Sequence, residues 1–240
     1  MALQQLYPIP TPGIDLQEDP KRLSSLYSWA GDAEAVAVNL ITSVNGSLTG
    51  ADNTSDTLSN PRDRRLLAEI RRDADLVLVG AATARAEAYT VPRHATLGIV
   101  TASGELPGVD VTAGERVVIF TTHTGTLPQL DARARIVPLH GDLLDAGQVI
   151  DACRRAGFAR ILCEGGGRLA RAMIATSRVD HVFWSISAQL VDSGIPWVVP
   201  GGTAAAHALR LRHLIHDTDS DALYTRWQST ADPGDSAPRR

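Results

Sequence analysis

The chain has 240 residues, of which 44% are hydrophobic and 21% charged, and its formal net charge is −4. This length supports one sizeable core, and the composition is that of a globular protein, so a single main domain is expected. The mildly acidic charge argues against a nucleic-acid-binding protein, and the absence of a long apolar run or a leader-like start argues against a membrane protein, which favours a cytoplasmic location.

The two ends of the chain differ from its middle. Residues 1–33 carry four prolines among scattered apolar side chains, which predicts an irregular arm packed on the main domain. Residues 34–228 are expected to form that domain. Residues 229–240 are polar and have little apolar surface to offset their ordering entropy, which predicts a disordered tail.

Short apolar runs recur through the middle of the chain and are interpreted as strands. They are Ala35–Ile41, Leu76–Val79, Leu97–Thr101, Arg116–Thr121, Ile136–Leu139, Arg160–Cys163, His181–Ser187, Leu209–Ile215 and Leu223–Trp227.

Helical patterns alternate with several of these runs. Asn60-Pro61 is an N-cap followed by proline at the first helical position, which predicts a helix to Arg72. Two further helices are expected over Asp142–Ala156 and Gly167–Thr176. The alternation predicts an α/β fold with a mostly parallel central sheet, an antiparallel edge and flanking helices. Cys153 and Cys163 have no metal-site spacing and are expected to be buried free thiols.

A triple glycine, Gly165–Gly167, lies between a predicted strand and a predicted helix. Such a turn lets a ligand approach the backbone, and the helix N-terminus that follows would attract a phosphate. A tight corner with no ligand remains an alternative for this motif alone. The spacing is not the dinucleotide fingerprint of a standard Rossmann domain.

A second loop follows the strand that ends at Val79. If this strand neighbours the one before the triple glycine, Gly80, Thr83 and Glu87 share its edge of the sheet, although Thr83 could instead be a plain helix N-cap. In a third segment, Asn45-Gly46 by itself indicates only a turn.

Five blocks in this order together resemble one family, the reductase domain of the bifunctional riboflavin-biosynthesis deaminase/reductase. The resemblance runs from Glu34 to Trp227 and implies a dihydrofolate-reductase-like three-layer fold. No zinc-deaminase signature is present, so a stand-alone reductase is expected. The blocks are Thr42–Gly46, Thr54–Thr57, Asn60-Pro61, Val79–Thr83 and Glu164–Leu169.

The resemblance also implies roles for individual residues, with NADPH as the cofactor. Residues that match positions holding a ribosylamino-pyrimidine phosphate substrate are Ser55, Arg71, Arg93 and Glu164, and either arginine could instead be a solvated charge. Asn45 and Glu87 are the candidate catalytic residues. The expected cofactor-binding residues are Thr42, Ser43, Thr57, Gly80, Thr83, Glu87, Thr101, Gly165, Gly166, Gly167, Arg168 and Leu169.

The sequence departs from the family at several ionisable positions. Asn39 replaces a lysine, Asn45 an aspartate and Ala88 an acidic residue, while Tyr89 stands where proline is usual. An amide cannot donate a proton as an acid does, so any acid must be Glu87, Glu164 or water.

The leading hypothesis is hydride transfer from NADPH to a pyrimidine- or pterin-like small molecule, as in 5-amino-6-(5-phosphoribosylamino)uracil reduction. The alternatives are a dihydrofolate- or pterin-type reductase and an NADPH-binding protein without turnover. Family resemblance also implies a homodimer, with residues 1–33 or the strands near His181–Ser187 as possible contacts.

Overall fold

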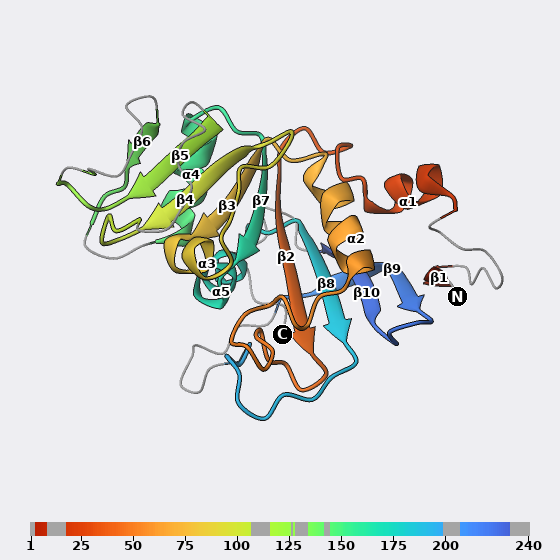
Figure 1. The fold of residues 1–240 in the computed structure, drawn as a ribbon. Coiled ribbons are helices and arrows are strands. Elements are labelled where there is room, and N and C mark those ends of the chain that lie inside the picture. Colours follow the sequence, from red (N-terminus) through yellow and green to blue (C-terminus); the bar gives the residue numbers. More distant parts are fainter. Residues whose placement is uncertain are drawn as a thin grey trace, which may run out of the picture.

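The protein folds around one ten-stranded sheet in the computed structural model, which describes residues 3–8, 18–106, 116–125, 127, 134–141, 145–198 and 207–230 (Figure 1). The strand order is β1-β9-β10-β8-β2-β7-β3-β4-β5-β6. The strands are β1 (Leu3–Tyr7), β2 (Ala35–Ser43), β3 (Leu76–Gly80), β4 (Thr96–Thr101), β5 (Val117–Thr121), β6 (Arg135–Pro138), β7 (Arg160–Gly165), β8 (His181–Ser187), β9 (Leu209–Asp217) and β10 (Leu223–Ser229).

Parallel pairing runs through the sheet from β8 to β6, whereas β8-β10, β10-β9 and β9-β1 are antiparallel. The predicted α/β fold with a mostly parallel sheet and an antiparallel edge is therefore confirmed. Helices lie between β2 and β3, β3 and β4, β6 and β7, and β7 and β8, because strands that run in the same direction cannot be joined by a tight hairpin.

Helices cover both faces of the sheet, which gives the expected three layers (Figure 1). Alternate side chains of β3 enter opposite cores: Val77 and Val79 pack with α1, α2 and α3, while Leu76 and Leu78 pack with α4 and α5. The helices are α1 (Pro20–Tyr27), α2 (Pro61–Arg71), α3 (Ala81–Ala86), α4 (Ala146–Arg155) and α5 (Gly167–Ala175).

The N-terminal segment is more regular than the sequence predicts. Residues 3–7 form the edge strand β1, which pairs antiparallel with β9, and α1 buries Leu23 and Tyr27 in the core. The prolines of this segment made regular structure unexpected. Pro20 is nevertheless the first residue of α1, a position where its missing N–H costs no hydrogen bond. The segment is thus part of the fold's sheet and core, and the expected irregular arm is wrong for its described residues.

Other predicted elements are found within a few residues of their expected ends. Helix α3 is an exception, since it occupies part of the stretch after β3 for which the sequence predicts a loop. Strand β10 continues to Ser229, so the predicted tail begins within a strand, and residues 231–240 lie outside the described residues. Cys153 and Cys163 are buried free thiols, as expected. Among the described residues, no helix is long and apolar enough to cross a membrane.

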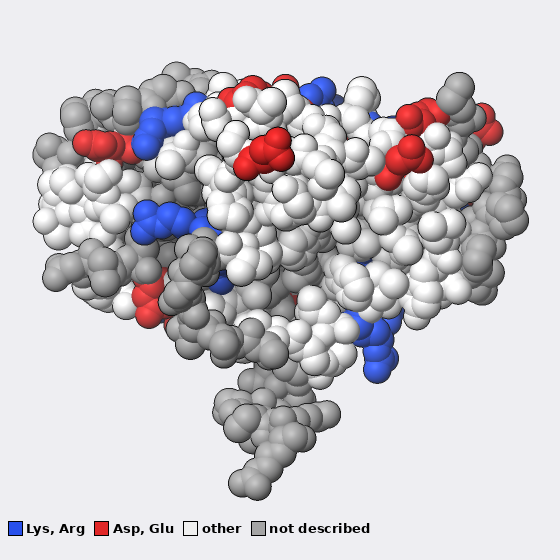
Figure 2. Space-filling view, turned by 90° about the horizontal axis from the view of Figure 1, so that it is seen from below, with Lys and Arg blue, Asp and Glu red and all other residues white. Residues whose placement is uncertain are grey.

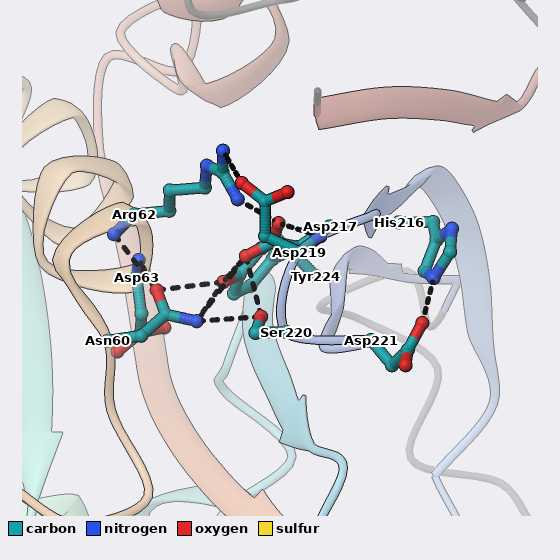
Figure 3. A network of polar contacts seen from close by, with 9 residues as sticks. All are labelled: Asn60, Arg62, Asp63, His216, Asp217, Asp219, Ser220, Asp221 and Tyr224. Carbon is teal, nitrogen blue, oxygen red and sulfur yellow. Dashed lines mark hydrogen bonds and ion pairs between the residues drawn. The ribbon is translucent and has the colours of Figure 1, made fainter. Parts of the chain in front are cut away.

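Helix α2 is anchored to the β9-β10 hairpin by a polar network (Figure 3). The Asn60 side chain caps the helix by accepting the backbone N–H groups of Arg62 and Asp63 at 2.9 and 2.8 Å. The same side chain donates to the Tyr224 hydroxyl and the Ser220 hydroxyl, each at 3.0 Å. The predicted N-cap is therefore confirmed and also fixes where α2 begins relative to the sheet.

Asp217, at the end of β9, is the buried charge of this network. Its carboxylate accepts hydrogen bonds from Arg62 and from the Ser220 hydroxyl, and Arg62 also pairs with Asp219 (Figure 3). Burial by itself would raise the pKa of Asp217, but the hydrogen bonds from Ser220 and Asp219 and the charge of Arg62 lower it below its usual value.

Replacing Asp217 by Asn is expected to lower the free energy of unfolding at pH 7 by about 2 to 4 kcal/mol, because Arg62 loses its buried partner. A carboxyl group with a depressed pKa stabilises the fold above its unfolded-state pKa of about 3.9 and loses this effect as the pH falls through the folded-state value. The difference from the wild type should therefore shrink below about pH 4. Urea unfolding at both pH values checks this.

The exposed Asp221, which contacts only His216 in this network, provides the control. Asp221→Asn should change stability by less than about 0.5 kcal/mol. Equal effects of the two substitutions would contradict the anchoring role of Asp217.

Candidate functional site

A cavity of about 840 Å³ opens where the parallel strands β2, β7 and β3 reach their carboxyl ends. Loops that follow neighbouring parallel strands meet at one edge of a sheet, and ligands of such folds bind there. Its lining residues are Asn39, Leu40, Ile41, Leu48, Thr49, Asp52, Asn53, Thr54, Ser55, Asp56, Ser59, Asp63, Arg64, Leu67, Arg71, Ala82, Thr83, Ala86, Glu87, Ala88, Tyr89, Thr90, Glu164, Gly165, Gly166, Gly167 and Ile195.

The triple glycine forms one wall of this cavity. Gly165 has a φ of +133°, which favours glycine, and Gly166 is the residue before the first turn of α5. The Gly166 N–H donates to the Thr83 hydroxyl at 2.9 Å. The strand order places β7 beside β3, so the expected meeting of the Thr83 loop and the triple glycine is confirmed.

There is no room for a side chain at Gly166 or Gly167. A Cβ atom on Gly166 would lie 2.4 Å from the Thr83 hydroxyl oxygen, and one on Gly167 would lie 2.3 Å from a methyl group of Leu48. No side chain caps the N-terminus of α5. The backbone of Gly165–Gly167 lines the cavity at this point.

Ser55 and Glu87 connect two of the loops around the cavity. The Ser55 hydroxyl donates to Glu87 at 2.6 Å, across 32 residues of sequence. Glu87 follows α3 directly, and Ala88 after it has a φ of +46°, in the left-handed region. This bend turns the chain so that Tyr89 also enters the cavity.

Arg71, Tyr89 and Glu164 form a compact ionic group at the cavity wall. Arg71 contacts both oxygens of Glu164 through Nε and Nη2, at 2.7 and 2.5 Å, and the Tyr89 hydroxyl donates to Glu164 Oε2 at 2.5 Å. The Glu164 side chain is only 1% exposed. Both partners therefore stabilise its negative charge in a site with little solvent.

This group affects how its members titrate. Burial would lower the pKa of Arg71, but the hydrogen bonds and charge of Glu164 raise it above its usual value. Burial, together with the negative charge of Glu164, raises the pKa of Tyr89 well above its usual value. Arg71 and Tyr89 consequently stay protonated at neutral pH and act as hydrogen-bond donors.

Asp63 is a further carboxylate at the cavity. It is the third residue of α2 and accepts the Ser185 hydroxyl at 2.6 Å and the Ser59 hydroxyl at 2.8 Å. Burial raises its pKa, although these two hydrogen bonds and the charge of Arg64 oppose the shift.

Within the described residues, no group of three His, Cys, Asp or Glu side chains is arranged to hold a metal ion.

The comparisons with known proteins fit this geometry. The sequence profile of the RibD C-terminal domain matches residues 34–221, which is most of the chain. The chain belongs to this family. No curated protein matches it closely enough to report. The RibD C-terminal domain family is one of NADPH-dependent reductases.

Several solved structures share the fold. A pyrimidine reductase-like protein from Corynebacterium diphtheriae is 20% identical, with a TM-score of 0.67 over 85% of this chain and 94% of its own. A riboflavin biosynthesis reductase from Saccharomyces cerevisiae is 12% identical, with a TM-score of 0.66 over 88% and 99%. Dihydrofolate reductase from Enterococcus faecalis is 9% identical, with a TM-score of 0.51 over 83% and 99%. At these identities the likeness shows the fold alone.

Of the residues that family resemblance singles out, eight line the cavity together. They are Ser55, Arg71, Thr83, Glu87, Glu164, Gly165, Gly166 and Gly167. The resemblance thus selected loops that are far apart in the sequence and close in the structure.

Of the first motif, Asn39 lines the cavity, whereas residues 42–46 are not among its lining residues. Asn45 is engaged elsewhere, because its side chain bonds both the N–H and the C=O of Val191, and Ser43 donates to Asn45 at 2.7 Å. The Thr42 hydroxyl accepts the Trp184 indole N–H, and Thr57 donates to Asp52.

The remaining predicted residues are not among the lining residues of the cavity. Gly80 precedes α3, and the Thr101 hydroxyl accepts the N–H of Gly104. Leu169 packs against the core that contains α5. Arg168 and Arg93 are exposed, and neither is among the lining residues.

Sequence reasoning missed Asp63. A signal was present, since Asp63 is spaced three and seven residues before Leu66 and Ile70, the buried positions of α2. A carboxylate in register with the apolar stripe of a helix points toward the core side, where burial requires partners.

Tyr89→Phe is expected to lower the free energy of unfolding by about 1 to 3 kcal/mol, because Glu164 loses a charge-assisted hydrogen bond at a buried position. Thermal or urea unfolding measures the change. Tyr7→Phe, at an exposed tyrosine, serves as the control and should be close to neutral. A neutral Tyr89→Phe would show that Arg71 alone holds Glu164.

Proposed function

We propose that this chain is an NADPH-dependent reductase that transfers hydride to a pyrimidine- or pterin-like substrate. The observation that carries the proposal is the open glycine turn at the N-terminus of α5, in the wall of a cavity at the carboxyl edge of β7 and β3. Family membership supports the same conclusion.

The residues present fit a dinucleotide. Side chains are excluded at Gly166 and Gly167, so the backbone can come within hydrogen-bonding distance of a pyrophosphate, and the positive end of the α5 dipole favours its charge. Thr83 holds the turn through Gly166. We assign Thr101 and Arg168 to the adenosine side of the same cofactor, because both lie at the same edge of the sheet.

When bound, NADPH supplies a hydride from its nicotinamide ring. The protein's part is to hold the acceptor carbon against that ring and to exclude water, which lowers the barrier through orientation. Glu87, fixed by Ser55, is proposed to bind the substrate or to relay a proton through water. Asn45 is proposed only to position the loop at Val191, since its side chain is engaged there.

Arg71 and Glu164 are proposed to bind substrate as a unit. Arg71 uses Nε and Nη2 on Glu164, so its Nη1 group remains to contact an anionic or carbonyl group in the cavity. Arg93 is not assigned a role in this proposal. A homodimer and a cytoplasmic location stay predictions from family resemblance and composition.

Titration with NADPH, followed by tryptophan fluorescence, tests the cofactor assignment, and NADH gives the comparison. Gly166→Ala should weaken NADPH binding at least about tenfold, or about 1.4 kcal/mol, because the added methyl group displaces the Thr83 hydroxyl that holds the turn. The matched control is Gly31→Ala, since nothing lies within 4 Å of a Cβ atom there.

Oxidation of NADPH in the presence of ribosylamino-pyrimidine or dihydropterin substrates, followed by absorbance, tests the reaction itself. Loss of NADPH absorbance would support the reductase. Tight binding without oxidation by any such substrate would favour the alternative of a non-catalytic NADPH-binding protein, and failure to bind either nucleotide would overturn the proposal.

A further inference from the structure

The charged side chains of the cavity are predominantly acidic. Among the described residues, its lining contains two cationic side chains, Arg64 and Arg71, and neither a lysine nor a histidine. The carboxylates of the lining are more numerous, and they are Asp52, Asp56, Asp63, Glu87 and Glu164. The proposed place for the pyrophosphate of NADPH is the glycine turn, so these side chains determine which charge the substrate can carry.

Arg71 already holds an anion of the protein itself. Its Nε and Nη2 atoms contact both oxygens of Glu164, which is the two-pronged geometry that a guanidinium group uses to hold a phosphate. The Glu164 side chain is almost completely buried and also accepts the Tyr89 hydroxyl. A phosphate group at Arg71 would have to displace this buried carboxylate or lie beside it, and either arrangement costs free energy.

Arg64 is more exposed, but it is close to two carboxylates. It pairs with Asp56 at 2.6 Å, and its charge opposes the rise in the pKa of Asp63 that burial causes. Exposed ion pairs are weak, so another anion could replace Asp56, but that anion would then be near Asp63. Arg93, the second arginine for which family resemblance implies a phosphate contact, is exposed and outside the lining.

The other carboxylates of the lining bind hydroxyl groups. Asp52 accepts two threonine hydroxyls, at 2.6 and 2.9 Å, and Glu87 accepts the Ser55 hydroxyl at 2.6 Å. Asp63 accepts two serine hydroxyls, at 2.6 and 2.8 Å. Ionised carboxylates have acceptor positions for several hydrogen bonds, so they can also accept hydroxyl or amino groups of a ligand.

We propose that the substrate part of the cavity excludes phosphate monoesters and accepts an unphosphorylated molecule whose hydroxyl or amino groups donate hydrogen bonds to the carboxylates. A phosphate monoester carries a charge of about −1.5 to −2 at neutral pH and would be repelled by these like charges. The Nη1 group of Arg71 then contacts a carbonyl group rather than an anion. This inference rests on the proposed reductase function, specifies its substrate class, and departs from the phosphorylated substrate that family resemblance implies.

A matched pair of ligands tests the proposal: 5-amino-6-ribosylaminouracil and its 5′-phosphate, which differ only in the phosphate group. Each is titrated calorimetrically into the protein saturated with NADP⁺. The wild type should bind the riboside at least about tenfold more tightly than the phosphate, because the carboxylates repel the added charge. Since salt screens repulsion between charges, this ratio should fall at least about twofold between about 0.02 M and about 0.5 M NaCl.

Glu164→Gln separates Arg71 from its anionic partner. This variant should shift the ratio at least about tenfold toward the phosphate, because the guanidinium group becomes available to a ligand anion. Asp52→Asn is the matched control, since it removes the same charge from the lining at an exposed position and leaves the pair of Arg71 and Glu164 in place. It should shift the ratio by less than about threefold.

Melting temperature and NADP⁺ affinity show whether each variant is folded, and the comparison within the wild type requires no variant. The proposal would be overturned by equal affinity for the two ligands, a preference for the phosphate, or absence of binding by both. A ratio that salt leaves unchanged, or equal shifts in the two variants, would overturn its electrostatic basis.

Failure of the reductase function is recognised separately. If the protein binds NADPH and oxidises it with the phosphorylated substrate, only the exclusion of phosphate is wrong. If it binds neither nucleotide, the reductase proposal is wrong.

Discussion

The parallel pairing of β7 between β2 and β3 is the constraint on which the site depends. It brings together the carboxyl ends of three strands. Residues as distant in the sequence as Ser55 and Glu164 therefore line the same cavity. Register matters as much as order, because Val79 pairs with Gly165 after a shift in the ladder. That placement allows Thr83 to accept the N–H of Gly166 and to join the two loops.

A second constraint is the position of α2. Its N-terminus is fixed to the β9-β10 hairpin through Asn60 and Asp217 (Figure 3). Asp63 in its first turn and Arg71 at its end both line the cavity. Structural and binding residues therefore share one helix. The network that stabilises the fold also determines where the candidate substrate-binding groups lie.

Charge is distributed unevenly between the cavity and the surface. The face at which β2 and β8 end shows acidic and basic side chains scattered among uncharged residues (Figure 2). Inside the cavity, Arg71 pairs with Glu164, which also accepts the Tyr89 hydroxyl, and Asp63 accepts two serine hydroxyls. Such an arrangement favours ligands that donate hydrogen bonds to carboxylates, with the glycine turn as the place for an anion.

The sequence by itself determined the fold class, most strands, three helices and the family. The periodicity of hydrophobic residues, the Asn60 cap and the five motifs each depend on residues that are near one another in the chain. They can therefore be recognised in the sequence alone. It did not determine that Pro20 begins a helix or that Asn45 is engaged by Val191. Only the tertiary structure decided the contact of Asn45 with Val191 and the grouping of Asp63 with Ser185, because contacts across more than a hundred residues depend on strand order and register.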